Sequence, residues 1–310
     1  MGNGNRGGAR ALAVAVTMVA SVVLASCAST TPTTGTPSTV GPTSTVPTSG
    51  SSAPQGSAAP PTSMTTAPGT MVPVKATVTV EHEVAGAYRQ GVAHTDDGGW
   101  VFSTNFALYR TDGALMEVAK NEAAIPADWL AKGYNHIGDI DIVGNVIFAP
   151  VEQPDTDVGR QAMFRFDATT LQFLDAIEIE QHHNSFVSVD PESMTAYSTD
   201  FFDDDVLSRY DVRNGWKRLP QIKLNRKVGH IQGGDLANGA FWLSTDDDHD
   251  GLYRIDLSSG EVIDLGSVGH ADGEGEGMDA TETSDGLLHV VSIDAKLLPV
   301  RFVELSVSPT

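Results

Sequence analysis

Short runs of apolar residues, separated by turn signals, follow one another from residue 75 to the end of the chain. Four of them share an apolar-x-Arg pattern that ends in Asp, at residues 107–112, 163–167, 207–211 and 252–256. Strand-like runs that end mostly in small or hydroxyl residues lie at 100–104, 146–150, 195–199, 241–245 and 287–292. Apolar runs bounded by turn residues predict short β-strands.

These runs belong to a repeat of nearly constant length. A Gly or Ser lies in a short inner strand of each repeat, and successive positions are 47, 47, 48 and 44 residues apart: Gly91, Gly138, Ser185, Gly233 and Gly277. Four strands in a repeat of this length are typical of one blade of a β-propeller. The sequence therefore predicts an all-β domain of the propeller class.

The last repeat has room for only three strands, the third of them at residues 300–307. The alternating segment 76–83 precedes the first repeat and can supply the missing outer strand, which would close the ring without an open sheet edge. We therefore predict five blades within a domain of residues 75–310. Six blades would need another repeat, and residues 121–134 are too short for one, so we expect an insertion there, with a helical turn.

A different pattern precedes the domain. Arg6 and Arg10 are followed by an apolar run at 11–24, which is the organisation of a secretory signal. The run is shorter than the about 20 residues that a membrane-spanning helix needs.

The sequence Leu24-Ala25-Ser26-Cys27 follows and resembles the lipobox of bacterial lipoproteins. The resemblance implies a signal peptide at 1–26 and a lipid, with palmitate among its chains, on Cys27. The chain would then be anchored in the cell membrane through this lipid, on its extracytoplasmic face. A secretory signal with a chance cysteine, or a short uncleaved anchor, is the alternative.

Residues 27–74 contain the lipidated cysteine followed by a stretch made almost entirely of Ser, Thr, Pro, Gly and Ala. Such a segment cannot bury enough apolar area to offset the entropy of ordering, so we predict a disordered, extended stalk. Cys27 is the only cysteine, and a disulfide within the chain is therefore excluded.

Charge is concentrated in the domain. None of the 40 acidic residues precedes Glu81, and two of the 19 basic residues lie in the signal, so the domain carries 17 − 40 = −23 charges. This field disfavours nucleic acid as a partner and favours cations.

In a propeller, the inner strands begin at the same face as the loops between the second and third strands. We name the axial opening at this face the mouth. Polar residues at the starts of the inner strands are expected to meet there: Gln90, His136, Asp139, His183, Asn184, His230, Gln232, Asp235, Glu274 and Glu276. An acidic rim is expected around them, from Glu152 with Asp155 and Asp157, from Asp200 with 203–205, and from the loop 246–250.

The domain is similar to secreted bacterial propellers of the gluconolactonase and strictosidine-synthase-like group. The resemblance rests on the pairs Gly138-Asp139, Gly234-Asp235 and Glu276-Gly277 and on the Arg-x-Asp third strands. It implies one divalent cation on the axis, calcium or a transition metal, with Asp139, Asn184, Asp235 and Glu276 as its ligands. The apparent five blades and the histidines of the mouth depart from the pattern of that group. The repeated arginines are expected to be structural: Arg110, Arg165, Arg209 and Arg254.

Three functions remain open from the sequence. The leading hypothesis is binding of a ligand, with a divalent cation, at an acidic, histidine-lined mouth. The alternative is a metal-dependent hydrolase or lyase acting on a lactone, ester or phosphoester, with His136, His183, His230 and Glu276 as catalytic candidates. A structural surface protein is the third. No nucleophile-elbow, zinc-protease or phosphate-loop motif is present.

Overall fold

The computed structural model describes residues 74–154, 160–202, 204–268, 273–281, 286–294 and 298–309. The predicted signal peptide, Cys27 and stalk lie outside these residues, as do three aspartates of the predicted rim, Asp155, Asp157 and Asp203. Within the described residues, no helix has the length and apolar character needed to cross a membrane.

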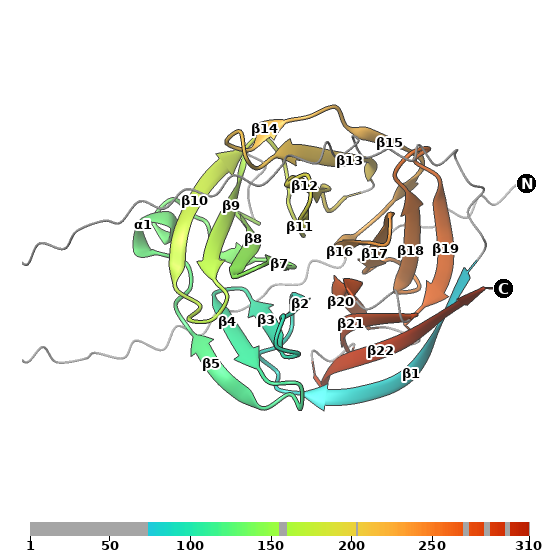
Figure 1. Cartoon of the computed structure of the whole chain (residues 1–310), viewed down its shortest axis with the longest axis horizontal. Coiled ribbons are helices and arrows are strands. Elements are labelled where there is room, and N and C mark those ends of the chain that lie inside the picture. Colours follow the sequence, from blue (N-terminus) through green and yellow to red (C-terminus); the bar gives the residue numbers. More distant parts are fainter. Residues whose placement is uncertain are drawn as a thin grey trace, which may run out of the picture. The chain divides into compact units, whose positions relative to one another are not determined.

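Five small antiparallel sheets form a ring, which confirms the predicted five-bladed β-propeller (Figure 1). Blade 1 contains β2 (Val92–His94), β3 (Trp100–Thr104), β4 (Ala107–Thr111) and β5 (Glu117–Asn121). Blade 2 contains β6 (His136–Ile137), β7 (Asp141–Val143), β8 (Val146–Glu152), β9 (Gln161–Asp167) and β10 (Phe173–Ile179). Blade 3 contains β11 (Ser188–Asp190), β12 (Thr195–Ser198), β13 (Asp204–Asp211), β14 (Lys217–Arg218) and β15 (Ile222–Val228).

Blade 4 contains β16 (Ile231–Ala237), β17 (Ala240–Thr245), β18 (Gly251–Asp256) and β19 (Val262–Ser267). Blade 5 contains β20 (Glu274–Asp279), β21 (Leu287–Ile293), β22 (Val300–Pro309) and β1 (Val74–Val84). The strand β1 is therefore the outer strand of the last blade, and it pairs with β22 from Val74↔Pro309 to Val84↔Val300. This pairing confirms the predicted closure of the ring.

Two blades are irregular, and both irregularities matter for the site. In blade 2 the inner strand is split into β6 and β7, and Asp139 between them forms a parallel bridge to Phe186 of blade 3. In blade 3 the outer strand is interrupted: β13 pairs with β14 near Tyr210 and with β15 near Leu207. Pro220 lies between β14 and β15, and a proline cannot donate a hydrogen bond to a sheet.

Most of the core lies between neighbouring blades. Each middle strand is covered on both faces, so β17 is buried at every position and reads as a continuous apolar or hydroxyl run. Phe186 of blade 3 packs against Phe241 of blade 4, with ring centroids 5.6 Å apart, and Leu243 joins the same cluster. Burial between blades, rather than within one sheet, therefore holds the ring together.

The segment between blades 1 and 2 is the predicted insertion. It contains the short helix α1 (Ala127–Leu130), which follows Pro126. Trp129 packs edge-on against Tyr134 and Phe164, at centroid distances of 5.0 Å to each ring.

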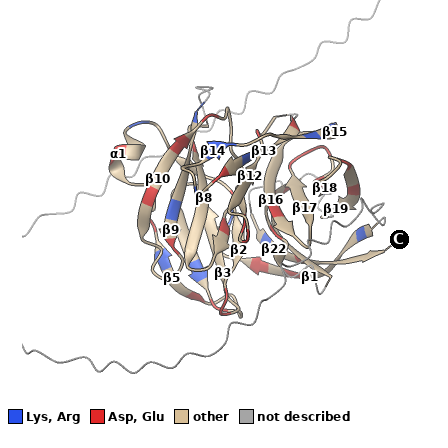
Figure 2. Cartoon of the chain, turned by 45° about the horizontal axis from the view of Figure 1, so that its top comes forward, with Lys and Arg blue, Asp and Glu red and all other residues tan. Residues whose placement is uncertain are grey.

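The repeated arginines contact residues of their own blades, as predicted. Arg110 forms an ion pair with Asp97 at 2.6 Å, and Arg165 forms one with Asp175. Arg254 lies over the Trp242 ring at 5.2 Å. Figure 2 shows basic residues mainly on third and fourth strands, such as β9 and β15.

Candidate functional site

The carboxylate of Asp139 lies where the inner strands of all five blades meet. Its Oδ1 accepts hydrogen bonds from the backbone N–H of Val92 (3.0 Å) and of Ile140 (3.1 Å). Its Oδ2 accepts from the N–H of Gly234 and Met278, both at 3.1 Å. Blades 1, 2, 4 and 5 thus donate to one side chain, and the bridge to Phe186 adds blade 3.

The glycines of the inner strands allow this close approach. A Cβ on Gly138 would overlap the carbonyl oxygen of Ser185 in the next blade. A Cβ on Gly277 would lie 2.5 Å from the Cα of Gly91, which is closer than real Cβ contacts occur. Small residues recur at these positions because neighbouring backbones occupy the space.

Three further aspartates bind backbone amides across blade boundaries. Asp141 accepts from the N–H of Val189, Asp235 from that of Ala280, and Asp279 from that of His94. Burial raises the pKa of Asp141 to about 7, with the charge of Asp235 adding to the rise. Burial and the charge of Asp279 raise the pKa of Asp235 to about 7 in the same way. These side chains connect blades, which is a structural role.

A second group of polar side chains lies at the mouth and contacts mainly its own members. Glu152 ends β8 and pairs in register with His136 at the start of β6. The Nδ1 of His136 lies 3.1 Å from Glu152 Oε1, and its Nε2 contacts Oε1 of Gln90. The Nδ1 of His183 lies 3.4 Å from Glu152 Oε2. We name these four residues the mouth network.

Glu152 is ionised within this network. Burial raises the pKa of Glu152, but hydrogen bonds from His136 and His183 outweigh that effect, so the pKa is lowered to about 2. The backbone N–H of Asn184 also donates to Oε2, at 3.2 Å. The two imidazoles are partly exposed, so the network can be reached from solvent.

The other side of the mouth carries carboxyl groups with the opposite tendency. Burial raises the pKa of Glu276 well above its ordinary value, the charges of Glu274 and Asp246 raise it further, and Arg89 opposes them. Burial and the charge of Glu274 raise the pKa of Asp246 to about 6. We name Asp246, Asp250, Glu274 and Glu276 the acidic corner.

A cluster of aromatic side chains contacts both the mouth network and the acidic corner. Phe202 is 59% exposed, and its ring lies 5.1 Å from that of His183. Phe201 stacks on His230 at 5.1 Å, with an interplanar angle of 3°. The Nδ1 of His230 lies 2.8 Å from the carbonyl oxygen of Asp246. We name Phe201, Phe202 and His230 the aromatic ledge.

The predicted site residues therefore separate into two sets. Of the catalytic candidates, His136 and His183 meet through Glu152, whereas His230 lies beside the acidic corner that contains Glu276. The sequence placed Glu152 on the rim, but the structure makes it the centre of the network. Phe201 and Phe202 were missed, because an aromatic pair in a loop gives no periodic signal.

The four predicted metal ligands do not form one donor set. The oxygens of Asp139 and Asp235 already accept N–H and O–H donors. The Nδ2 of Asn184 donates to the Ala162 carbonyl oxygen at 2.9 Å, while its buried Oδ1 has no hydrogen-bond partner in the part of the chain that the structure describes. Among the described residues, no group of three or more His, Cys, Asp or Glu is arranged to hold a metal ion. The four predicted ligands therefore do not fit a shared divalent cation. Metal binding by this protein stays a prediction.

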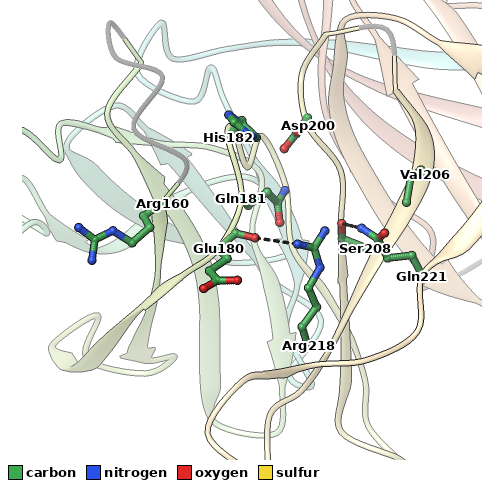
Figure 3. A pocket seen from close by; sticks show the side chains of 9 residues that line it. All are labelled: Arg160, Glu180, Gln181, His182, Asp200, Val206, Ser208, Arg218 and Gln221. Atoms are coloured by element: carbon green, nitrogen blue, oxygen red, sulfur yellow. Dashed lines mark hydrogen bonds between the residues drawn. The ribbon is translucent and has the colours of Figure 1, made fainter.

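A separate groove of about 440 Å³ lies between blades 2 and 3, where the outer strand of blade 3 is interrupted (Figure 3). Arg218 crosses it and donates from Nη1 to the carbonyl oxygen of Glu180 at 3.5 Å. Gln221 donates to the hydroxyl of Ser208 at 3.1 Å. The first contact links the two blades, and the second lies within blade 3.

Comparison with known proteins places this chain among β-propellers. No protein-family model and no curated protein matches the sequence. Glutaminyl cyclase from Myxococcus xanthus has a similar structure, with a TM-score of 0.56, 16% identity, and coverage of 76% of this chain and 99% of that one.

Hydrazine synthase from Kuenenia stuttgartiensis is similar over 72% of this chain and 63% of its own, at 12% identity and a TM-score of 0.44. A luciferin-regenerating enzyme is similar over 70% of this chain and 76% of its own, at 12% identity and a TM-score of 0.45. At such identities the similarity shows the fold alone.

Proposed function

We propose that this chain is a lipid-anchored protein of the extracytoplasmic face whose propeller binds a small polar ligand at the mouth. The lipobox-like sequence ending in Cys27 and the stalk that follows support the anchoring. A stalk of that composition would carry the domain away from the membrane surface.

The mouth network is the observation that supports ligand binding. The axial aspartates bind backbone amides of neighbouring blades, so their role is to hold the ring together. Glu152, His136 and His183 instead bind one another, at a place that solvent reaches. A buried carboxylate whose pKa is strongly shifted by specific partners in an opening is typical of a functional site.

A thermal-shift panel of small polar compounds on the full chain tests this proposal. A compound that binds only the folded state stabilises it, by about 2.7 kcal/mol at one hundred times its Kd. We expect at least one stabilising compound to lose its effect in His183→Asn. The matched control is His82→Asn, at an exposed position of β1, and it should respond like the wild type. Equal responses of both variants would contradict the proposal.

A divalent cation, calcium or a transition metal, is tested separately by elemental analysis of the full chain after gel filtration in metal-free buffer. One ion per chain would support it. No ion, together with folding that a chelator does not change, would leave ligand binding without a metal.

An acid–base enzyme is the second candidate, because two carboxyl groups at the mouth have pKa values shifted in opposite directions. Ionised Glu152 and the adjoining imidazoles can accept a proton, and Glu276 can retain and donate one. The M. xanthus protein, named a glutaminyl cyclase, shows that a similar fold carries an enzyme.

Assays with ester, lactone, phosphoester and N-terminal glutamine substrates test this candidate. Turnover by the wild type should be lost in Glu276→Gln and His183→Asn, while His82→Asn keeps it. Turnover that survives both mouth variants would remove the mouth from the mechanism.

A further inference from the structure

A cavity of about 330 Å³ opens beside the acidic corner, and its lining comes from two loops of blade 4: Gly229, His230, Asp247, Asp248 and His249. The backbone N–H of Asp246 donates to the His230 carbonyl oxygen at 2.8 Å, so the two loops are joined at the mouth. The cavity thus borders His230 of the aromatic ledge and the loop that carries Asp246 and Asp250.

Asp250 supplies the strongest sign of a missing partner. The residue is only 3% exposed, and its Oδ2 has no hydrogen-bond partner among the described residues. Burial raises the pKa of Asp250 to about 6, and the charges of Asp246, Asp247 and Glu274 add to the rise. A buried carboxylate oxygen without a donor is costly, and a cationic donor would remove that cost.

The other groups that face Asp250 and Asp246 define the charge of the corner. Asp247 accepts from the Tyr253 hydroxyl at 2.5 Å, and His249 Nδ1 lies 3.2 Å from it. Arg226 lies over the Tyr253 ring and 4.0 Å from Asp264, outside the corner. Even with Arg89, which acts on Glu276, acidic groups outnumber basic ones there, and this favours a cation over an anion.

The aromatic ledge selects the kind of cation. The exposed ring of Phe202 offers an apolar surface and a π face, on which the stem of an organic cation can pack. His230 has a φ of 51°, in the left-handed region that non-glycine residues adopt at a cost, and in this conformation its ring stacks on Phe201. A bare metal ion would use neither ring, and no described group of ligands is arranged for one.

We propose that the acidic corner binds the ammonium group of a primary organic amine, whose apolar stem packs on Phe202. The proposal rests on the proposed function, because it names the class of ligand that the mouth takes. A primary ammonium has three N–H donors, which suit the Oδ2 of Asp250 and the oxygens of Asp246 and Glu274. A quaternary ammonium has none, so it is the poorer fit.

Isothermal titration of the full chain with benzylamine and with benzyl alcohol, in a buffer containing EDTA, tests the proposal. The two probes have similar shape, but only the amine is charged. We expect benzylamine to bind at least about tenfold more tightly, as one charge-assisted hydrogen bond predicts. At pH 6, in two buffers of different ionisation enthalpy, binding should release protons, because an ammonium lowers the pKa of Asp246 and Asp250.

Variants locate the binding. The double variant Asp246→Asn with Asp250→Asn should bind benzylamine at least about tenfold more weakly and should release no protons on binding. The control Glu122→Gln removes one exposed charge on the loop after β5, outside the acidic corner, the aromatic ledge and the mouth network, and should change neither quantity. If the double variant fails to fold, Phe202→Leu, at an exposed position, still tests the aromatic ledge. This variant should lower the affinity for benzylamine several-fold.

The outcomes separate this proposal from the proposed function. Equal affinity for both probes, or no benzylamine binding, overturns the amine proposal. If the thermal-shift panel still finds compounds that depend on His183, ligand binding at the mouth stands without it. If benzylamine binds but neither Asp246→Asn with Asp250→Asn nor Phe202→Leu weakens it, the amine binds elsewhere and the proposal is wrong.

Discussion

Replacing Asp139 by Asn should destabilise the propeller although the two side chains have the same shape. Each carboxylate oxygen of Asp139 accepts two backbone N–H groups. An asparagine offers one oxygen, and its NH₂ group would face the N–H pair on the other side. Two buried donors then lose their acceptor, at about 1–3 kcal/mol each, so the free energy of unfolding should fall by about 2–6 kcal/mol.

The protonation state of Asp139 decides whether this estimate holds. Burial raises the pKa of Asp139 well above its ordinary value, although the amides of Met278, Val92 and Gly234 oppose the rise. A proton on either oxygen would face N–H donors, so the amides favour the ionised form.

Urea denaturation of the full chain at pH 7 measures the loss. Asp96→Asn is the control, because Asp96 is exposed in the turn before β3 and its replacement should change stability by less than about 0.5 kcal/mol. A loss below about 1 kcal/mol in Asp139→Asn would refute the reasoning, since it would mean that the carboxyl is neutral or that the amides find other acceptors.

Glu152, Gly138 and Cys27 each allow a direct test of one further expectation. The pKa of Glu152 is lowered from 4.5 to about 2, so its ionised form should stabilise the fold by about 3 kcal/mol above pH 4.5. This stabilisation should be lost as the pH falls from 4.5 through 2. Urea denaturation of the wild type and of Glu152→Gln at pH 7 and pH 3 measures the loss, and an identical pH dependence of the two proteins would contradict the prediction. Gly138→Ala should lower the unfolding temperature sharply, because its Cβ would overlap the Ser185 carbonyl oxygen; an unchanged melting temperature would show that the strands can separate there. Cys27→Ala should move the chain from the membrane fraction to the soluble fraction in a bacterial host and remove the lipid mass, and an unchanged mass spectrum would argue against lipidation.

The architecture could be predicted from the sequence because its signals are local. Strand runs, turn residues and a repeat of 44 to 48 residues are visible along the chain, and the lone segment 76–83 had one available partner. The pairing of β1 with β22 shows that this reasoning from sheet closure was sufficient.

The chemistry of the site could be predicted only in part, because it depends on contacts between blades. Asp139 and His136 are three residues apart and look equally suited to bind a ligand. In the structure, Asp139 accepts hydrogen bonds from backbone amides of three other blades, whereas His136 contacts Glu152. That distinction depends on the side-chain directions and on the positions of neighbouring strands, which residue types alone do not encode.

The central claim is that the mouth network binds a ligand, and a crystal structure of the full chain with the most stabilising compound from the thermal-shift panel tests it most directly. The account predicts the compound against Glu152 and His183, within hydrogen-bond distance of at least one of them. A compound bound only in the groove between blades 2 and 3, or at the opposite end of the axis near Asp141 and Asp235, would contradict it.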